Sequence, residues 1–188
     1  MRTIIDWCKM LDEKRIKDAE NNVKTYLKDG LIWKYKIYRK EIFETYLRNY
    51  KESLDIAQKL FDQNLSPLWI VVISYYTLYY VANAVLYEIG YKVGTKISHK
   101  VTEDALIVLV RNKLKKELLD DYEEAREEAL DIIGRKTDEI IESFGQEMEK
   151  RAFFQYESTE DIKRAKANTS LERAKKFVFE MKKLLKSK

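Results

Sequence analysis

Proline, glycine, cysteine and histidine are all scarce in this chain of 188 residues, which has one proline, five glycines, one cysteine and one histidine. So few turn-forming residues argue against an all-β fold, which needs many turns. The single cysteine, Cys8, excludes an internal disulfide. The single histidine, His99, excludes His-rich metal sites and a structural zinc, so we expect no metal and no cofactor.

Charge is missing from one long stretch, although 36% of all residues are charged: the 25 residues that end before Glu88 carry none. Within this stretch Ser66 suits a helix N-cap and Pro67 suits the first helical position, while Gly90 suits a left-handed C-cap. The sequence therefore predicts one apolar helix over about 66–90. A helix that is apolar nearly all round lies either at the centre of a bundle or within a membrane.

Polar side chains within this helix favour the bundle over the membrane. Five tyrosines are spread along it rather than gathered at its ends, together with Ser74, Thr77 and Asn83. Buried phenols find hydrogen-bond partners more readily in a protein interior than in lipid. The first fifteen residues carry Asp6 and Lys9 within their apolar stretch and lack a small-residue cleavage site, so they are not a secretory signal. We expect a cytoplasmic protein with no membrane partner.

Apolar residues recur at helical spacing along most of the chain, which predicts an all-α antiparallel bundle of about five to seven helices around the central helix. The length fits a single domain over 1–188. We expect helices at about 3–29, 41–63 and 66–90, from 101 onward, and from 171 onward, with a break at Gly134 or Gly145, a short extended piece within 31–40, and loops at 91–100 and 157–170.

Acidic and basic residues are unevenly distributed. The segment from Glu117 to Lys150 has thirteen acidic residues against four basic ones, whereas the tail from Ile162 to Lys188 is strongly basic. Such a tail could attract a phosphate backbone. The alternative is that both segments are solvated faces, or that they pair with each other within a dimer.

The sequence contains no Gly-rich phosphate loop, nucleophile elbow or Cys-His pair, and one histidine cannot supply a di-metal carboxylate bundle. His99 follows Ser98 at the entry of a helix, where it either ties a loop or serves catalysis or ligand binding. Asn83 and Ser74 need partners, because an unpaired buried polar group costs about 1–3 kcal/mol. We expect a buried network within the bundle; the alternative for Asn83 is a pocket or a two-fold interface.

Three segments in a fixed order carry a family resemblance. WIVVISYYTLYYVANAVLYEIGY is similar to a helix of the form A-x-x-x-A-Y-Y-A-x-F-x-x-A-x-A-x-L-x-x-x-G, and Ser98-His99 follows it. RAFFQY then precedes an acidic-polar loop and a helix containing AKKF. Together these segments resemble the HEPN family of small helical domains, in the branch that accompanies minimal nucleotidyltransferases. The resemblance covers about 43–185, and implies an N-terminal extension over 1–40 and a bundle over 41–188 with a helical insertion at about 117–146.

The resemblance also bears on catalysis. Nuclease members of the family share an Arg followed four to six residues later by His, placed at a dimer interface. Here Arg151 is present, but Tyr156 stands where the His would be. A phenol with a pKa near 10 is a poor general base at neutral pH. His99 replaces it only if the fold brings His99 beside Arg151. The candidate catalytic residues are therefore Arg151, Tyr156 and His99.

The function that the resemblance implies is a homodimer lacking the full nuclease motif. It would act as a partner-binding or nucleotide- or RNA-associated module, in a toxin-antitoxin or nucleotidyltransferase pair. One alternative is a metal-independent ribonuclease that uses Arg151 with Tyr156 or His99. The other is a purely structural bundle in which Arg151 pairs with the acidic stretch.

Overall fold

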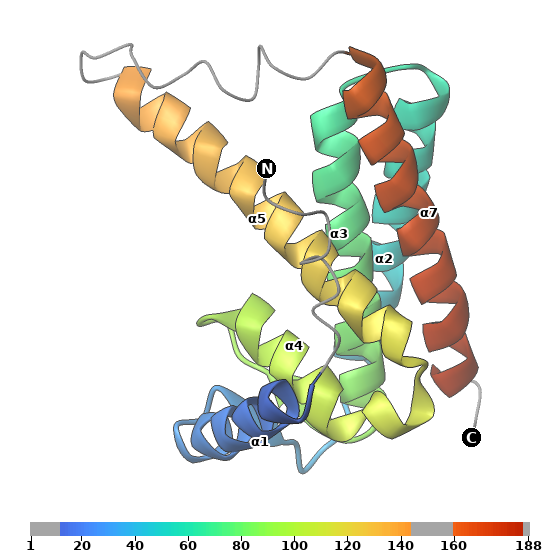
Figure 1. Cartoon of the computed structure of the whole chain (residues 1–188). Helices are drawn as coiled ribbons and strands as arrows, with labels where there is room; N and C mark the ends of the chain where they lie inside the picture. Colours follow the sequence, from blue (N-terminus) through green and yellow to red (C-terminus); the bar gives the residue numbers. More distant parts are fainter. Residues whose placement is uncertain (1–11, 144–159, 186–188) are drawn as a thin grey trace.

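The computed structural model describes residues 12–143 and 160–185. In these two ranges six α-helices and one very small sheet form a helical bundle (Figure 1), which confirms the predicted all-α fold class. The elements are α1 (Glu13–Lys28), β1 (Ile32–Lys34), α2 (Lys40–Asp62), α3 (Pro67–Glu88), β2 (Tyr91–Val93), α4 (Ser98–Leu109), a 3-10 turn (Arg111–Lys113), α5 (Lys116–Ser143) and α7 (Glu160–Leu185).

Helix α3 is the predicted charge-free helix, and its bounds are confirmed. Ser66 occupies the N-cap position, Pro67 is the first helical residue, and Gly90 follows the C-cap with a φ of 101°. The helix is long and apolar enough to cross a membrane, but its most apolar window is 67% buried among other elements of this chain. This burial is that of a core helix.

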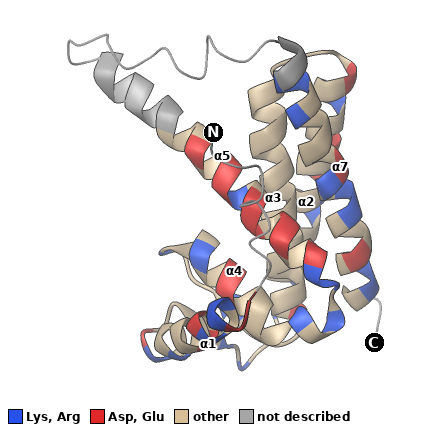
Figure 2. Ribbon diagram, viewed as in Figure 1, with Lys and Arg blue, Asp and Glu red and all other residues tan. Residues whose placement is uncertain are grey.

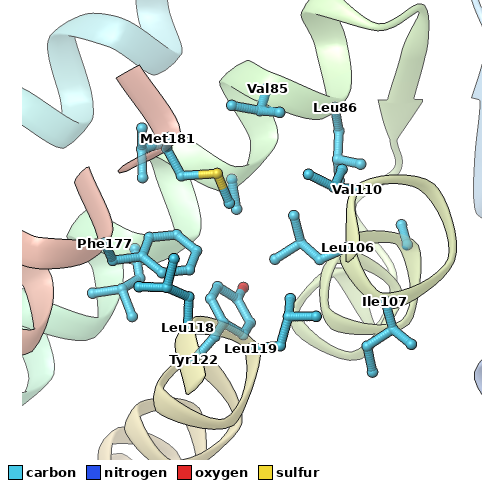
Figure 3. Close-up of a cluster of buried hydrophobic side chains, with 14 of the residues drawn as sticks. Val85, Leu86, Leu106, Ile107, Val110, Leu118, Leu119, Tyr122, Phe177 and Met181 are labelled. Atoms are coloured by element: carbon cyan, nitrogen blue, oxygen red, sulfur yellow. The ribbon is translucent and has the colours of Figure 1, made fainter. Parts of the chain in front are cut away.

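Two helices flank α3 along its length (Figure 1). Helix α2 runs antiparallel to α3, because only a short turn joins them, whereas α7 runs in the same direction as α3. Helix α5 crosses α3 obliquely. Figure 3 shows the core where α3, α4, α5 and α7 meet, filled by Val85, Leu86, Leu106, Ile107, Val110, Leu118, Leu119, Tyr122, Phe177 and Met181.

Helix α1 and the small sheet close one end of the bundle. Helix α1 lies beside α4 and buries Ala19 and Val23. Strands β1 and β2 pair antiparallel, with Ile32 opposite Val93, and both of these side chains are buried in the same core as α1. The extended piece expected within 31–40 is thus confirmed as β1.

Two expected boundaries are wrong, and one expected break is tested in part. The loop expected at 91–100 contains β2 and the start of α4, because a strand of three residues forms through pairing with β1 rather than through its own pattern. The loop expected at 157–170 is helical from Glu160 onward; this segment packs through the small residue Ala167 against Ala57 and Ile70. Gly134 does not break α5, and Gly145 lies outside the described residues.

Asn83 and Ser74, for which the sequence predicts buried partners, behave differently. Asn83 donates through Nδ2 to the carbonyl oxygen of Tyr79 at 2.9 Å and to Oγ1 of Thr102 at 3.2 Å, which confirms a buried network within the bundle. The hydroxyl of Ser74 is buried and finds no hydrogen-bond partner in the described part of the chain. The expectation of a partner is wrong for Ser74.

Two glycines give a matched test of the helix boundaries. Gly134 lies in the exposed interior of α5 with open space around it, so Gly134→Ala should raise the unfolding free energy by about 0.5–1 kcal/mol. Gly90 also has open space, but its φ of 101° disfavours any side chain, so Gly90→Ala should lower it by about 1–2 kcal/mol. Urea unfolding of both variants measures this. Changes of the same sign would contradict the assigned helix ends.

Candidate functional site

Two consecutive carboxylates are buried on α4. Glu103 is 2% exposed and Asp104 is fully buried, although both are charged residues that normally face solvent. Each is compensated by cations from other helices, as buried charges need to be. We call the two carboxylates, the arginines that pair with them and the neighbouring His99–Tyr75 pair the α4 polar cluster: Arg15, Tyr75, His99, Glu103, Asp104 and Arg126.

Helix α1 supplies most of the partners of Asp104. Arg15 spans both carboxylates, with Nη1 at 2.7 Å from Oδ1 of Asp104 and Nη2 at 2.5 Å from Oε1 of Glu103. Asn22 and Tyr26 each donate to Oδ2 of Asp104 at 3.0 Å. Burial, and then the negative charge of Asp104, raise the pKa of Tyr26 to about 12, so this phenol stays protonated as a donor.

Helix α5 supplies the second guanidinium. Nε of Arg126 lies 2.5 Å from Oε2 of Glu103, and Nζ of Lys100 lies 3.8 Å from Oε1. Burial raises the pKa of Glu103, and the positive charges of Arg126, Lys100 and Arg15 oppose this effect. Glu103 therefore joins three helices, because α1 and α5 each bring an arginine to a carboxylate on α4.

His99 lies one turn before Glu103, on the α3 side of the cluster. Its Nδ1 lies 2.6 Å from the hydroxyl of Tyr75, and its ring centre lies 4.6 Å from that of Tyr79. Burial, followed by the charge of Arg126, lowers the pKa of His99, so the imidazole is neutral at pH 7. Burial raises the pKa of Tyr75 far above its ordinary value. These two groups form a neutral hydrogen-bonded pair.

The chemistry open to this cluster follows from its pairing. Both carboxylates face guanidinium groups, so neither is poised as a general base. Within residues 12–143 and 160–185, no group of three or more acidic, His or Cys side chains is placed to hold a metal ion. Nε2 of His99 has no hydrogen-bond partner in the same ranges.

The structure places one of the three predicted catalytic residues. Arg151 and Tyr156 lie outside the described residues, and only His99 is placed, in the first turn of α4. The sequence interpretation missed Glu103 and Asp104. Their signal is present in VTEDALIVLV, where two adjacent acidic residues interrupt an otherwise uncharged, largely apolar run.

The acidic and basic segments meet within one chain. Figure 2 shows acidic residues along α5 and basic residues along α7. The guanidinium of Arg173 lies 3.4 Å from Asp121 and 2.9 Å from Glu124, and Nζ of Lys166 lies 3.3 Å from Glu128. Several cations of the basic tail are thus occupied by carboxylates of α5.

In comparisons with known proteins, no family model, no curated protein and no solved structure matches this chain. Its function is therefore inferred from its own side chains.

The pH dependence of stability tests the placement of His99. Its pKa is lowered in the folded state from 6.5, so the unfolded chain binds a proton more readily and stability falls as pH drops through about 6.5. In His99→Asn this loss should vanish, because the chain has no other histidine. Urea unfolding at pH 5, 6, 7 and 8 measures both profiles. Profiles that stay parallel from pH 8 to pH 5 would show that His99 is not buried in this way.

Proposed function

We propose that this chain is an HEPN-like helical module that binds a partner and a nucleotide or RNA, and that it does not cleave RNA by the usual family mechanism. It acts as a homodimer in the cytoplasm, and a nucleotidyltransferase of a toxin-antitoxin pair is the candidate partner. The observation that carries this proposal is the engagement of the only histidine. Nδ1 of His99 is hydrogen-bonded to Tyr75, and the nearby carboxylates of Glu103 and Asp104 are paired with arginines.

A binding role fits this arrangement for a physical reason. An RNA-cleaving site without a metal needs a group that moves a proton and a cation that is free to stabilise the phosphate. In the α4 polar cluster both Arg15 and Arg126 are already occupied by carboxylates. Arg151 would then serve as a bidentate ligand for a phosphate or carboxylate.

A metal-independent ribonuclease is the second candidate. The observation that favours it is the neutral imidazole of His99, whose Nε2 has no hydrogen-bond partner in the described ranges. In the tautomer whose Nδ1–H donates to Tyr75, Nε2 is the unprotonated nitrogen and can accept a proton. In this alternative Arg151, with Tyr156 or His99, would act on the RNA. The third candidate is a structural bundle, which the ion pairs of Arg173 with α5 favour.

Three measurements on Arg151→Ala separate these candidates: RNA cleavage, the solution mass and ATP binding. The full chain is incubated with end-labelled structured and single-stranded RNA, sized by light scattering, and titrated with ATP. We expect the unsubstituted chain to be a dimer that yields no RNA products. ATP should bind at least fivefold more weakly to Arg151→Ala, since a charged hydrogen bond contributes about 1.5–3 kcal/mol. Arg48→Ala, at an exposed site on α2, is the matched control.

Each opposite result selects another candidate. RNA products that disappear in Arg151→Ala would establish the ribonuclease. A monomer whose ATP binding is the same in Arg151→Ala would overturn the proposed module. A lower melting temperature in Arg151→Glu, with association unchanged, would leave the structural bundle.

A further inference from the structure

The end of the bundle that carries the two-stranded sheet is both basic and aromatic. Residues 33–40, WKYKIYRK, alternate rings and cations from β1 to the start of α2. Most of these side chains are exposed, and β2 and the loop after it add two further lysines. We call this group the hairpin surface; it consists of the exposed residues Trp33, Lys36, Tyr38, Arg39 and Lys96, together with the half-buried Lys92.

Strand pairing sets the first ring of this surface. Ile32 and Val93 point into the core, so the next pair, Trp33 and Lys92, lies on the outer face of the sheet. Nζ of Lys92 lies 5.6 Å from the centre of the Trp33 ring. Gly94 allows the close approach of the chain to β1, because a Cβ there would lie only 3.1 Å from the carbonyl oxygen of Leu31.

The loop that follows β1 is fixed by Tyr87 at the end of α3. The ring of Tyr35 stacks on that of Tyr87 with centres 4.5 Å apart, and its hydroxyl donates to the Tyr87 carbonyl oxygen at 2.8 Å. The backbone N–H of Arg39 donates to the Tyr87 hydroxyl at 3.0 Å. Tyr38 remains 46% exposed between Lys36 and Arg39. The loop backbone and the second ring, whose centre lies 5.5 Å from that of Tyr87, are therefore held in place before any ligand binds.

The cations of the hairpin surface differ from those of α7 in their pairing. In the described part of the chain, Lys36, Arg39, Lys92 and Lys96 make no ion pair with a carboxylate. The neighbouring Lys40 does pair, with Glu44 at 3.3 Å, and so is left out of the surface. Unpaired cations beside exposed rings give a positive potential that is available to an anionic ligand.

We propose that the hairpin surface binds a single-stranded nucleic acid, with bases stacked on Trp33 and Tyr38 and phosphates beside Lys36, Arg39 and Lys92. Lys92 lies over the Trp33 ring, and Arg39 follows Tyr38 in the chain, so rings and cations share this surface, as a strand of bases and phosphates requires. A duplex hides its base faces, and a lipid surface calls for a larger set of exposed aliphatic side chains than Ile37 and Ile97 provide beside these residues. This inference rests on the RNA-associated part of the proposed function and locates it outside the Arg151 segment.

Fluorescence anisotropy with the full chain tests this surface. The probes are a labelled 12-nucleotide single-stranded RNA, the same sequence as DNA, and the RNA annealed to its complement, each between 50 and 200 mM salt. We expect the single strands to bind more tightly than the duplex. In the double variant Lys36→Gln with Arg39→Gln, affinity should fall roughly tenfold, and the slope of log affinity against log salt should lose about 1.4.

Two further sets of variants provide the controls. Lys14→Gln with Lys17→Gln removes two exposed, unpaired cations from the far end of α1 and should leave affinity within about twofold. Trp33→Leu and Tyr38→Leu keep an apolar side chain but remove the ring, and each should weaken binding at least about fivefold. Circular dichroism melts show that each variant is folded.

Four results would overturn the inference: no binding of any strand, equal loss in the α1 control, full binding by the leucine variants, or binding to phosphatidylserine vesicles in preference to the strands. Its failure is distinct from that of the proposed function. Strand binding that survives the hairpin variants but is lost in Arg151→Ala would remove this surface and keep the module. If the unsubstituted chain is a monomer that does not bind ATP, but still binds single strands through the hairpin surface, the proposed module is overturned and this surface remains.

Discussion

The burial of two adjacent carboxylates, Glu103 and Asp104, is the constraint on which the rest of this structure depends. A carboxylate taken out of water is tolerated only when cations and donors replace its hydration. Here Arg15 from α1 and Arg126 from α5 provide those cations. Two helices that share little apolar contact with each other are thereby fixed to the same turn of α4. Burial lowers the pKa of His99, and the charge of Arg126 lowers it further, so the same constraint contributes to keeping the only histidine neutral.

The charges of this chain fall into paired and unpaired groups, and the two have different consequences. Paired charges build the scaffold: the α4 polar cluster joins α1, α4 and α5, and Arg173 joins α7 to the acidic face of α5. The unpaired cations of the hairpin surface leave a positive potential on one end of the bundle. The buried charges of this scaffold are paired, whereas the cations of the hairpin surface are not, among the residues that the structure describes. Such a surface is suited to binding an anionic partner.

The central helix could be predicted because its signals are local: a charge-free run, Ser66 and Pro67 at one end and Gly90 at the other. Strand β2 could not, since three residues become a strand only through pairing with β1, about sixty residues earlier. The early start of α7 was missed because small residues such as Ala167 form its packed face, and they leave no large apolar stripe.

The candidate site was predicted only in part, and the reason is again physical. His99 was recognised as a residue at a helix entry, but its link to Tyr75 and Arg126 depends on how α3 and α5 pack. Glu103 and Asp104 carry a visible signal, since acidic side chains inside an apolar run need buried cations. Their partners come from positions far along the chain, which no single sequence reveals.

A double-mutant cycle between Glu103 and Arg126 tests most directly whether the buried carboxylates hold the helices together. The unfolding free energies of Glu103→Gln, Arg126→Met and the double variant give the coupling energy, and the exposed pair Lys40 and Glu44 gives the matched control. We predict a coupling of about 2–3 kcal/mol for the buried pair and at most about 0.5 kcal/mol for the exposed one. Equal, small couplings for both pairs would contradict this account.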